Sequence, residues 1–188
     1  MNLYHIHIST KAATNVKGWK KTQIKLEKGD IEQEDIMFTK TVKGTDSVDS
    51  DIFKFIANYG KLFNFNRFKV EVINNPGVVD SYSNKTYREI HIKTSIPIAK
   101  FKVTKLRLQE FGEIHNFALS NNPKEINTSY ITQFINMRFL SGDKQSSDIK
   151  IKNILDLLGT VGNCNIIEVK DEVSVFDTNF TMDKWWAH

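Results

Sequence analysis

The 188-residue chain has one cysteine, three prolines and no long apolar run. Because a disulfide needs two cysteines, Cys164 cannot form one within the chain, and one thiol cannot build a cysteine-based zinc site. We expect Cys164 to be a small buried residue. No segment approaches the ~20 apolar residues of a membrane helix, and the first residues already read as a strand without a signal-peptide pattern. We therefore expect a cytoplasmic protein that does not enter a membrane.

Several motifs of catalytic and cofactor sites are also missing. The sequence has no glycine-rich phosphate loop, no Gly-x-Ser-x-Gly elbow of serine hydrolases, and no His-x-x-x-His or carboxylate cluster at metal-ligand spacing. We therefore expect no cofactor and no metal site, so that any hydrolytic chemistry would be metal-independent.

The composition suits a folded protein with a mildly basic surface. Hydrophobic residues make up 40% of the chain and charged residues 26%, which are values of an ordinary globular protein. The formal net charge is +4 and permits an acidic partner without requiring one, because the excess is spread along the chain. The abundance of Lys, Asn and Ile indicates an AT-rich source such as a phage, a large DNA virus or a low-GC bacterium.

The chain appears to repeat one module. Residues 51–60 align with residues 150–159 at an offset of 99, and both their apolar positions and their final glycines coincide. Residues 37–40 align with residues 135–138 at an offset of 98, which places Lys40 on Arg138. This repetition predicts two equivalent halves.

Alternation and capping signals predict the elements of each half. In the first half we expect strands at 2–9, 22–26, 36–42 and 68–73 and a helix at 51–60. In the second half we expect strands at 87–96, 113–119, 131–140, 165–170 and 172–176, a helix at 148–158 and a short helix at 105–111.

This order predicts an α+β fold of two tandem ferredoxin-like modules, each with a helix on an antiparallel sheet, that form one globular unit. The predicted boundaries are 1–73 for the first module, 74–86 for the linker and 87–188 for the second module with its C-terminal tail. Trp185 and Trp186 in this tail are expected to pack over a core edge.

Two histidines in equivalent strands are the candidate catalytic residues. Imidazole titrates near neutral pH, so His7 and His91 suit the base and acid roles of phosphodiester cleavage. Strand alternation places Ser9 on the face of His7, and Lys93 on the face of His91, where both suit a phosphate oxygen. His5 shares the face of His7 and suits the same role. The alternative is that these histidines lie on half-exposed strand faces.

Further candidate phosphate ligands are the aligned cations Lys40 and Arg138, which the repeat predicts in one cleft. Thr39 should face away from it. Ser120 and Asn121, at a predicted strand end, can donate to an anion or simply form a turn. The alternative for the cations is a solvated strand face.

The motif His7-Ile8-Ser9-Thr10 resembles that of the two-histidine phosphoesterases, whose two pseudo-symmetric halves each supply one His-x-Thr/Ser-x motif. In the second half, His91-Ile92-Lys93 has lysine where that family has a hydroxyl residue. The resemblance implies metal-independent action on RNA ends or cyclic nucleotides.

The tandem plan is also similar to that of CRISPR repeat-processing ribonucleases, without their glycine-rich loop. Three segments look similar to an uncharacterised family of tandem-repeat proteins: 88–93, 119–122 and 175–179.

Two functions follow as hypotheses. The first is a metal-independent phosphodiesterase, or a nucleotide- or RNA-end-binding protein, whose partner is a phosphate-containing small molecule or an RNA end. The second is a non-catalytic viral or phage-type protein that binds and inhibits a host factor, in which case the partner is a protein.

Overall fold

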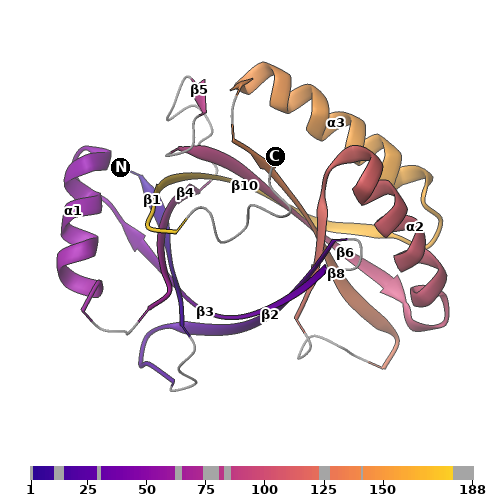
Figure 1. Ribbon diagram of the computed structural model, residues 1–188, viewed down its shortest axis with the longest axis horizontal. Helices are drawn as coiled ribbons and strands as arrows, with labels where there is room; N and C mark the ends of the chain where they lie inside the picture. Colours follow the sequence, from indigo (N-terminus) through magenta and orange to yellow (C-terminus); the bar gives the residue numbers. More distant parts are fainter. Residues whose placement is uncertain are drawn as a thin grey trace.

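The computed structural model describes residues 2–10, 15–28, 31–61, 65–73, 81–82, 86–122, 128–140 and 142–179. Eight of the described strands close into an antiparallel barrel in the order β1-β3-β2-β7-β8-β6-β10-β4 (Figure 1). Their bounds are Leu3–Ser9 (β1), Lys20–Lys28 (β2), Ile31–Lys43 (β3), Arg67–Ile73 (β4), Tyr87–Pro97 (β6), Ala118–Asn121 (β7), Tyr130–Phe139 (β8) and Asn165–Asp177 (β10). A small separate sheet pairs β5 (Ser81–Tyr82) with β9 (Gly142–Asp143).

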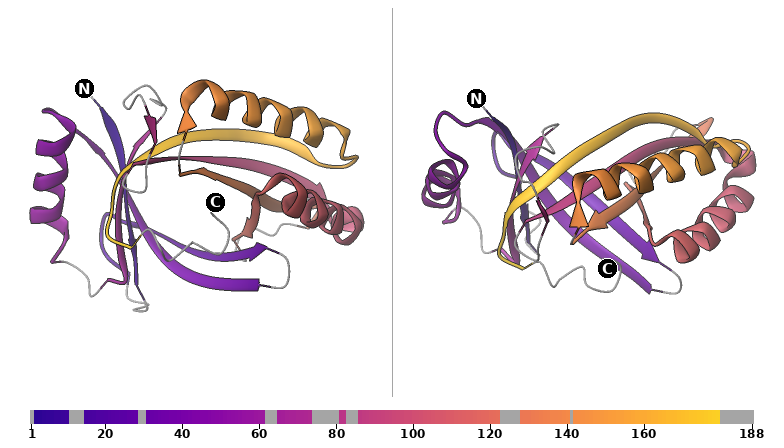
Figure 2. Two further views of the ribbon diagram at one scale, coloured as in Figure 1. Left: turned by 45° about the horizontal axis from the view of Figure 1, so that its top comes forward. Right: turned by 90° about the horizontal axis from the view of Figure 1, so that it is seen from above.

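In the described part of the chain, three α-helices lie outside the barrel: α1 (Val48–Tyr59), α2 (Phe101–His115) and α3 (Lys144–Thr160). A short 3-10 turn, η2 (Ile98–Lys100), leads into α2. Figure 1 shows α1 on one side of the barrel and α2 and α3 on the other, and Figure 2 shows the same separation from two further directions. None of the helices in the described part is long and apolar enough to cross a membrane.

The prediction of two ferredoxin-like helix-on-sheet modules is wrong. Edge strands of the two halves hydrogen-bond to each other, β4 with β10 and β2 with β7, so one barrel replaces two sheets. The halves contribute their four strands in the same order, β2-β3-β1-β4 and β7-β8-β6-β10. Because an unpaired strand edge exposes backbone donors and acceptors, closure satisfies groups that two separate sheets would leave open.

The predicted helices at 51–60 and 148–158 are present as α1 and α3. Each begins earlier than predicted, because Ser47 and Asp143 are the N-caps and accept hydrogen bonds from the backbone N–H groups of Ser50 and Ser146. The predicted strand at 113–119 is wrong in its first residues. There α2 continues to His115 and ends at Asn116, which adopts the left-handed conformation at φ 59°.

Alternation along the strands sends apolar side chains outward, against the helices. One core lies between α1 and the outer face of the first half: Tyr4, Ile6, Ile8, Phe38, Ile52, Phe55, Phe68, Val70 and Val72 are its buried members. The larger core lies against α2 and α3 and includes Ile90, Ile92, Leu108, Ile135, Ile154 and Leu158. Since the apolar faces point outward, the opposite faces of the same strands, which carry polar residues, point into the barrel.

Two predicted features fall wholly or largely outside the described residues. The linker 74–86 is described only at 81–82, which form β5, and at residue 86. The tail residues Trp185 and Trp186 are not described. Cys164 is described and buried, as expected.

Candidate functional site

The barrel encloses a cavity of about 450 Å³ to which all eight strands contribute. Among the described residues its lining includes five lysines and arginines, namely Lys20, Arg67, Lys69, Arg138 and Lys170. It also includes the carboxylates Asp35, Glu71, Glu89 and Glu172 and the histidines His5, His7 and His91. Buried charges are costly unless they are paired or bind a charged ligand, so this lining marks the cavity as the candidate site.

Cross-strand neighbours on the cavity face repeat between the two halves. One row in each half centres on a histidine: Thr39, His7 and Lys69 in the first, and Asn136, His91 and Lys170 in the second. The adjacent rows are Thr41, His5 and Glu71 in the first half, and Arg138, Glu89 and Glu172 in the second. His7 and His91 therefore occupy equivalent positions in the wall of one cavity.

His7 is held by partners on both sides of its ring. Its Nδ1 lies 2.9 Å from Oγ1 of Thr39, and its Nε2 lies 2.7 Å from Oε2 of Glu71. The other oxygen of Glu71 lies 2.5 Å from the Nζ of Lys69. The expectation that Thr39 faces away from the cleft is wrong, since Thr39 lies across from His7 and lines the cavity.

His91 is placed as a doubly protonated imidazolium. Its Nδ1 lies 2.7 Å from Oδ1 of Asn136, whose amide nitrogen donates to the backbone oxygen of Ala118 at 3.4 Å. Because this orientation of the amide turns its oxygen toward the ring, Nδ1 of His91 must carry a proton. The Nε2 of His91 lies 3.6 Å from a carboxylate oxygen of Glu89 and 3.6 Å from one of Glu172.

These neighbours change the proton affinity of His91. Burial alone would lower the pKa of this imidazole, but the carboxylates of Glu89, Glu172 and Glu71 outweigh it and raise the pKa to about 9. At neutral pH His91 therefore contributes a positive charge to the cavity.

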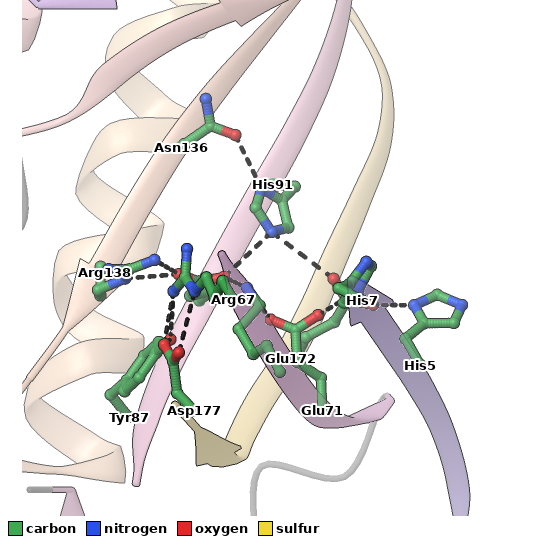
Figure 3. A network of polar contacts seen from close by, with 12 residues as sticks. His5, His7, Arg67, Glu71, Tyr87, His91, Asn136, Arg138, Glu172 and Asp177 are labelled. Carbon is green, nitrogen blue, oxygen red and sulfur yellow. Dashed lines mark hydrogen bonds and ion pairs between the residues drawn. The ribbon is translucent and has the colours of Figure 1, made fainter. Parts of the chain in front are cut away.

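Most other cations in the barrel are neutralised by carboxylates (Figure 3). Glu89 accepts from Nε of Arg138 at 2.5 Å and from Nζ of Lys69 at 2.7 Å. Burial would raise the pKa of Glu89, but these two cations hold it well below its ordinary value. Arg67 binds both oxygens of Asp177, at 3.0 and 2.6 Å.

Lys20 and Lys170 differ from these paired cations. Neither makes an ion pair with any residue in the described ranges. Lys20 is exposed and lies across from Thr39 in the row of His7, and Lys170 is half-buried and lies across from His91. Both ammonium groups are therefore accessible to a ligand that enters the cavity.

The structure brings most of the predicted site residues together. Five of them line the cavity beside His7: Ser9, His91, Ser120, Asn121 and Arg138. Of these, Ser9 donates to a carboxylate oxygen of Asp35 at 2.6 Å. The hydroxyl of Ser120 accepts from the Asn136 amide at 2.9 Å, so both hydroxyls already have protein partners.

The prediction that Lys40 shares a cleft with Arg138 is wrong. Its Nζ lies outside the barrel, 5.7 Å from the ring centre of Trp19 and 4.8 Å from that of Tyr59. The pairing register makes Thr41 the counterpart of Arg138, because both lie one row away from the histidines. A one-residue error in the repeat alignment exchanges the two faces of a strand.

Lys93 is also not among the described residues that line the cavity. Its Nζ lies 5.7 Å from the ring centre of Phe134, beside the irregularity in β10 between Ile166 and Glu168.

Sequence reasoning missed several residues of the cavity lining: Lys20, Thr39, Lys69, Glu71, Glu89, Lys170 and Glu172. A signal for some of them is present. In β4, Arg67, Lys69 and Glu71 alternate with Phe68 and Val70, so charged residues occupy one complete face of a strand. All of these residues are buried. A strand with one charged face and one apolar face, both buried, indicates a polar barrel interior.

The fold also assembles a group of potential metal ligands that have no recognisable spacing in the sequence. One ligand atom from each of His5, His7, Glu71 and Glu172 lies within 4.8 Å of all the others. The expectation of no metal site was based on local spacing alone.

Comparison of this chain with protein-family models, with curated proteins and with solved structures finds no match. The resemblance to two-histidine phosphoesterases therefore rests on the motif around His7 alone.

Proposed function

We propose that the barrel interior binds the phosphate group of a small molecule, such as a nucleotide, or of an RNA end. The observation that carries this proposal is a set of three positive groups in the two histidine-centred rows of the cavity wall. Lys20, Lys170 and the imidazolium of His91 all line the cavity, and the first two have no carboxylate partner among the described residues.

The charge of these groups suits a phosphate. A phosphate monoester carries a charge of about −1.5 to −2 at neutral pH. Asp177 neutralises Arg67, the other four lysines and arginines of the lining equal its four carboxylates in number, and protonated His91 adds one positive charge. Such an excess of about one charge favours an anionic ligand such as a phosphate, whereas a neutral ligand would leave it uncompensated.

The same arrangement supports phosphodiester cleavage as the reaction to test. Because His91 is protonated at neutral pH, we assign it the role of the general acid that protonates the leaving oxygen. His7 keeps the base role proposed from its motif, and Thr39 and Glu71 orient its ring. Arg138 stacks over the ring of Tyr87 at 4.6 Å and binds Glu89, so its role is to position that carboxylate.

The experiment is calorimetric titration with pyrophosphate, ATP, a 2′,3′-cyclic nucleotide and a 5′-phosphorylated RNA oligomer. We expect at least one to bind, with an affinity that decreases as salt is added, because exposed charges are screened. Lys20→Met and Lys170→Met should each weaken binding about tenfold, which is ~1.4 kcal/mol and the scale of a charge-assisted hydrogen bond.

Lys152→Met is the matched control, since Lys152 is on the exposed side of α3 and its removal changes the net charge equally. If none of the four compounds binds, or if the two cavity variants bind as tightly as Lys152→Met, the phosphate proposal is wrong. The alternative of a non-catalytic protein-binding role would then be preferred.

A further inference from the structure

We propose that His5, His7, Glu71 and Glu172 bind a divalent transition-metal ion inside the barrel. This inference goes beyond phosphate binding and does not depend on it, because it can be tested with the metal alone. A bound ion would occupy Nε2 of His7 and would therefore replace the base role proposed for that residue.

The four side chains come from adjoining strands. β1 supplies both histidines, β4 supplies Glu71 and β10 supplies Glu172, and β4 is hydrogen-bonded to both of the other strands. Figure 3 shows the four side chains converging beside β1. Donor atoms around an ion with bonds of ~2.1 Å are typically ~3–4 Å apart. The observed separations of up to 4.8 Å therefore need only small side-chain rotations to reach that geometry.

Unsatisfied buried atoms provide a second observation. The Nε2 of His7 and both carboxylate oxygens of Glu71 are buried without a hydrogen-bond partner. Glu71 has an exposed fraction of 0% and His7 of 8%. Lys69 and His7 form ion pairs with Glu71 at 2.5 and 2.7 Å, which offset the cost of burying its charge, but neither contact is aligned as a hydrogen bond. Coordination to an ion would give Nε2 of His7 and the oxygens of Glu71 the directional bonds that these contacts lack.

Neighbouring groups already orient the ligands. The contact of Nδ1 of His7 with Thr39 fixes the ring so that Nε2 points toward Glu71, as in sites where a hydrogen bond to one ring nitrogen directs the other to a metal.

The donor set selects the class of ion. Two imidazole nitrogens favour zinc, iron, manganese or a similar first-row ion, whereas magnesium and calcium prefer oxygen ligands alone. Two carboxylates also balance the two positive charges of the ion. In the structure Nδ1 of His5 contacts Oε1 of Glu172 at 2.5 Å, so the ion would replace a shared proton at that position.

The test is calorimetric titration of the full chain, stripped with a chelator, with Zn²⁺, Mn²⁺ and Mg²⁺ at pH 7.5. We expect one Zn²⁺ or Mn²⁺ per chain, bound at least tenfold more tightly than Mg²⁺. Affinity should decrease between pH 7.5 and 6, because protons compete for the imidazole nitrogens.

Glu71→Gln and His5→Asn should each reduce the affinity about a hundredfold or more. His115→Asn at the end of α2 is the control and should bind as the wild type does. Circular dichroism must first show that each variant is folded. If Glu71→Gln does not fold, His5→Asn alone provides the test, because the His5 side chain is 16% exposed and tolerates replacement better. An absence of stoichiometric binding by the wild type, or unchanged binding by a folded variant, would overturn the inference. Nucleotide binding without metal would leave the proposed phosphate site intact.

Discussion

The charge of His91 should make the stability of the protein depend strongly on pH. The pKa of its imidazole is raised in the folded state, from an ordinary 6.5 to about 9. The stabilisation is therefore fully present below pH 6.5, decreases above it, and is lost as pH rises through about 9. A difference of about 2.5 units corresponds to ~3 kcal/mol of unfolding free energy, at 1.36 kcal/mol per unit.

His91→Gln is the variant that isolates this effect. Glutamine keeps a polar side chain beside Asn136 but cannot gain a proton. Urea unfolding at pH 6 and pH 9.5 should show the wild type losing ~3 kcal/mol more than the variant over this interval. Other groups that titrate in the interval, including the buried thiol of Cys164, contribute to both proteins and cancel in the comparison.

A nuclear magnetic resonance titration of the His91 ring measures the same pKa without unfolding. His115→Gln serves as the control for unfolding and should retain the full pH dependence of the wild type. If the His91 ring titrates near pH 6.5, or if His91→Gln shows the same loss of stability as the wild type, the reasoning about its carboxylate neighbours is refuted.

Three further predictions concern packing and charge. Glu89→Gln leaves two buried cations without their shared carboxylate, and urea unfolding should show a loss of ~3–5 kcal/mol; a loss below 1 kcal/mol would contradict the pairing. Gly44→Ala should lower the melting temperature strongly, because an added Cβ would overlap the carboxylate of Asp51, whereas Gly159→Ala in α3 has open space and should be neutral or stabilising. Lys40→Met should lower the free energy of unfolding by only ~0.5–1 kcal/mol, because it loses the contacts of the ammonium group with the aromatic rings, and should leave the affinity for pyrophosphate unchanged. Weaker pyrophosphate binding by this variant would place Lys40 in the site after all.

The local structure of this chain is largely predictable from its sequence. Alternation of apolar and polar residues marks β1, β4 and β6, and helical spacing with flanking caps marks α1 and α3. Both signals come from neighbouring residues, so they require no knowledge of the tertiary fold. The boundary of α2 was missed because Phe117 and Leu119 extend the apolar pattern beyond the left-handed residue Asn116.

The closure of the barrel was not predictable in this way. The repeat predicts that both halves contain similar sheets, but it carries no information about which sheet edges meet. Closure depends on the pairing of β4 with β10 and of β2 with β7, which are contacts between distant segments. Until the sheet is closed, a polar face such as that of Lys69 and Glu71 is indistinguishable from a solvent-exposed face.

The candidate site was predicted in part for the same reason. His7 and His91 were placed in one cavity because both lie on equivalent strands of the repeat. Lys40 was misplaced because the offset differs between segments of the repeat, and a shift of one residue moves a side chain to the other face. Glu172 was missed because its partners His5 and His91 are far from it in sequence.

The most direct test of the phosphate site is a titration of ¹⁵N-labelled histidine side chains with pyrophosphate, followed by nuclear magnetic resonance. If phosphate binds inside the barrel, the ring resonances of His7 and His91 shift together and saturate at one ligand per chain, while those of His115 on α2 stay unchanged. If the His7 and His91 resonances do not move, or if His115 moves with them, phosphate does not occupy the barrel interior and the central claim is contradicted.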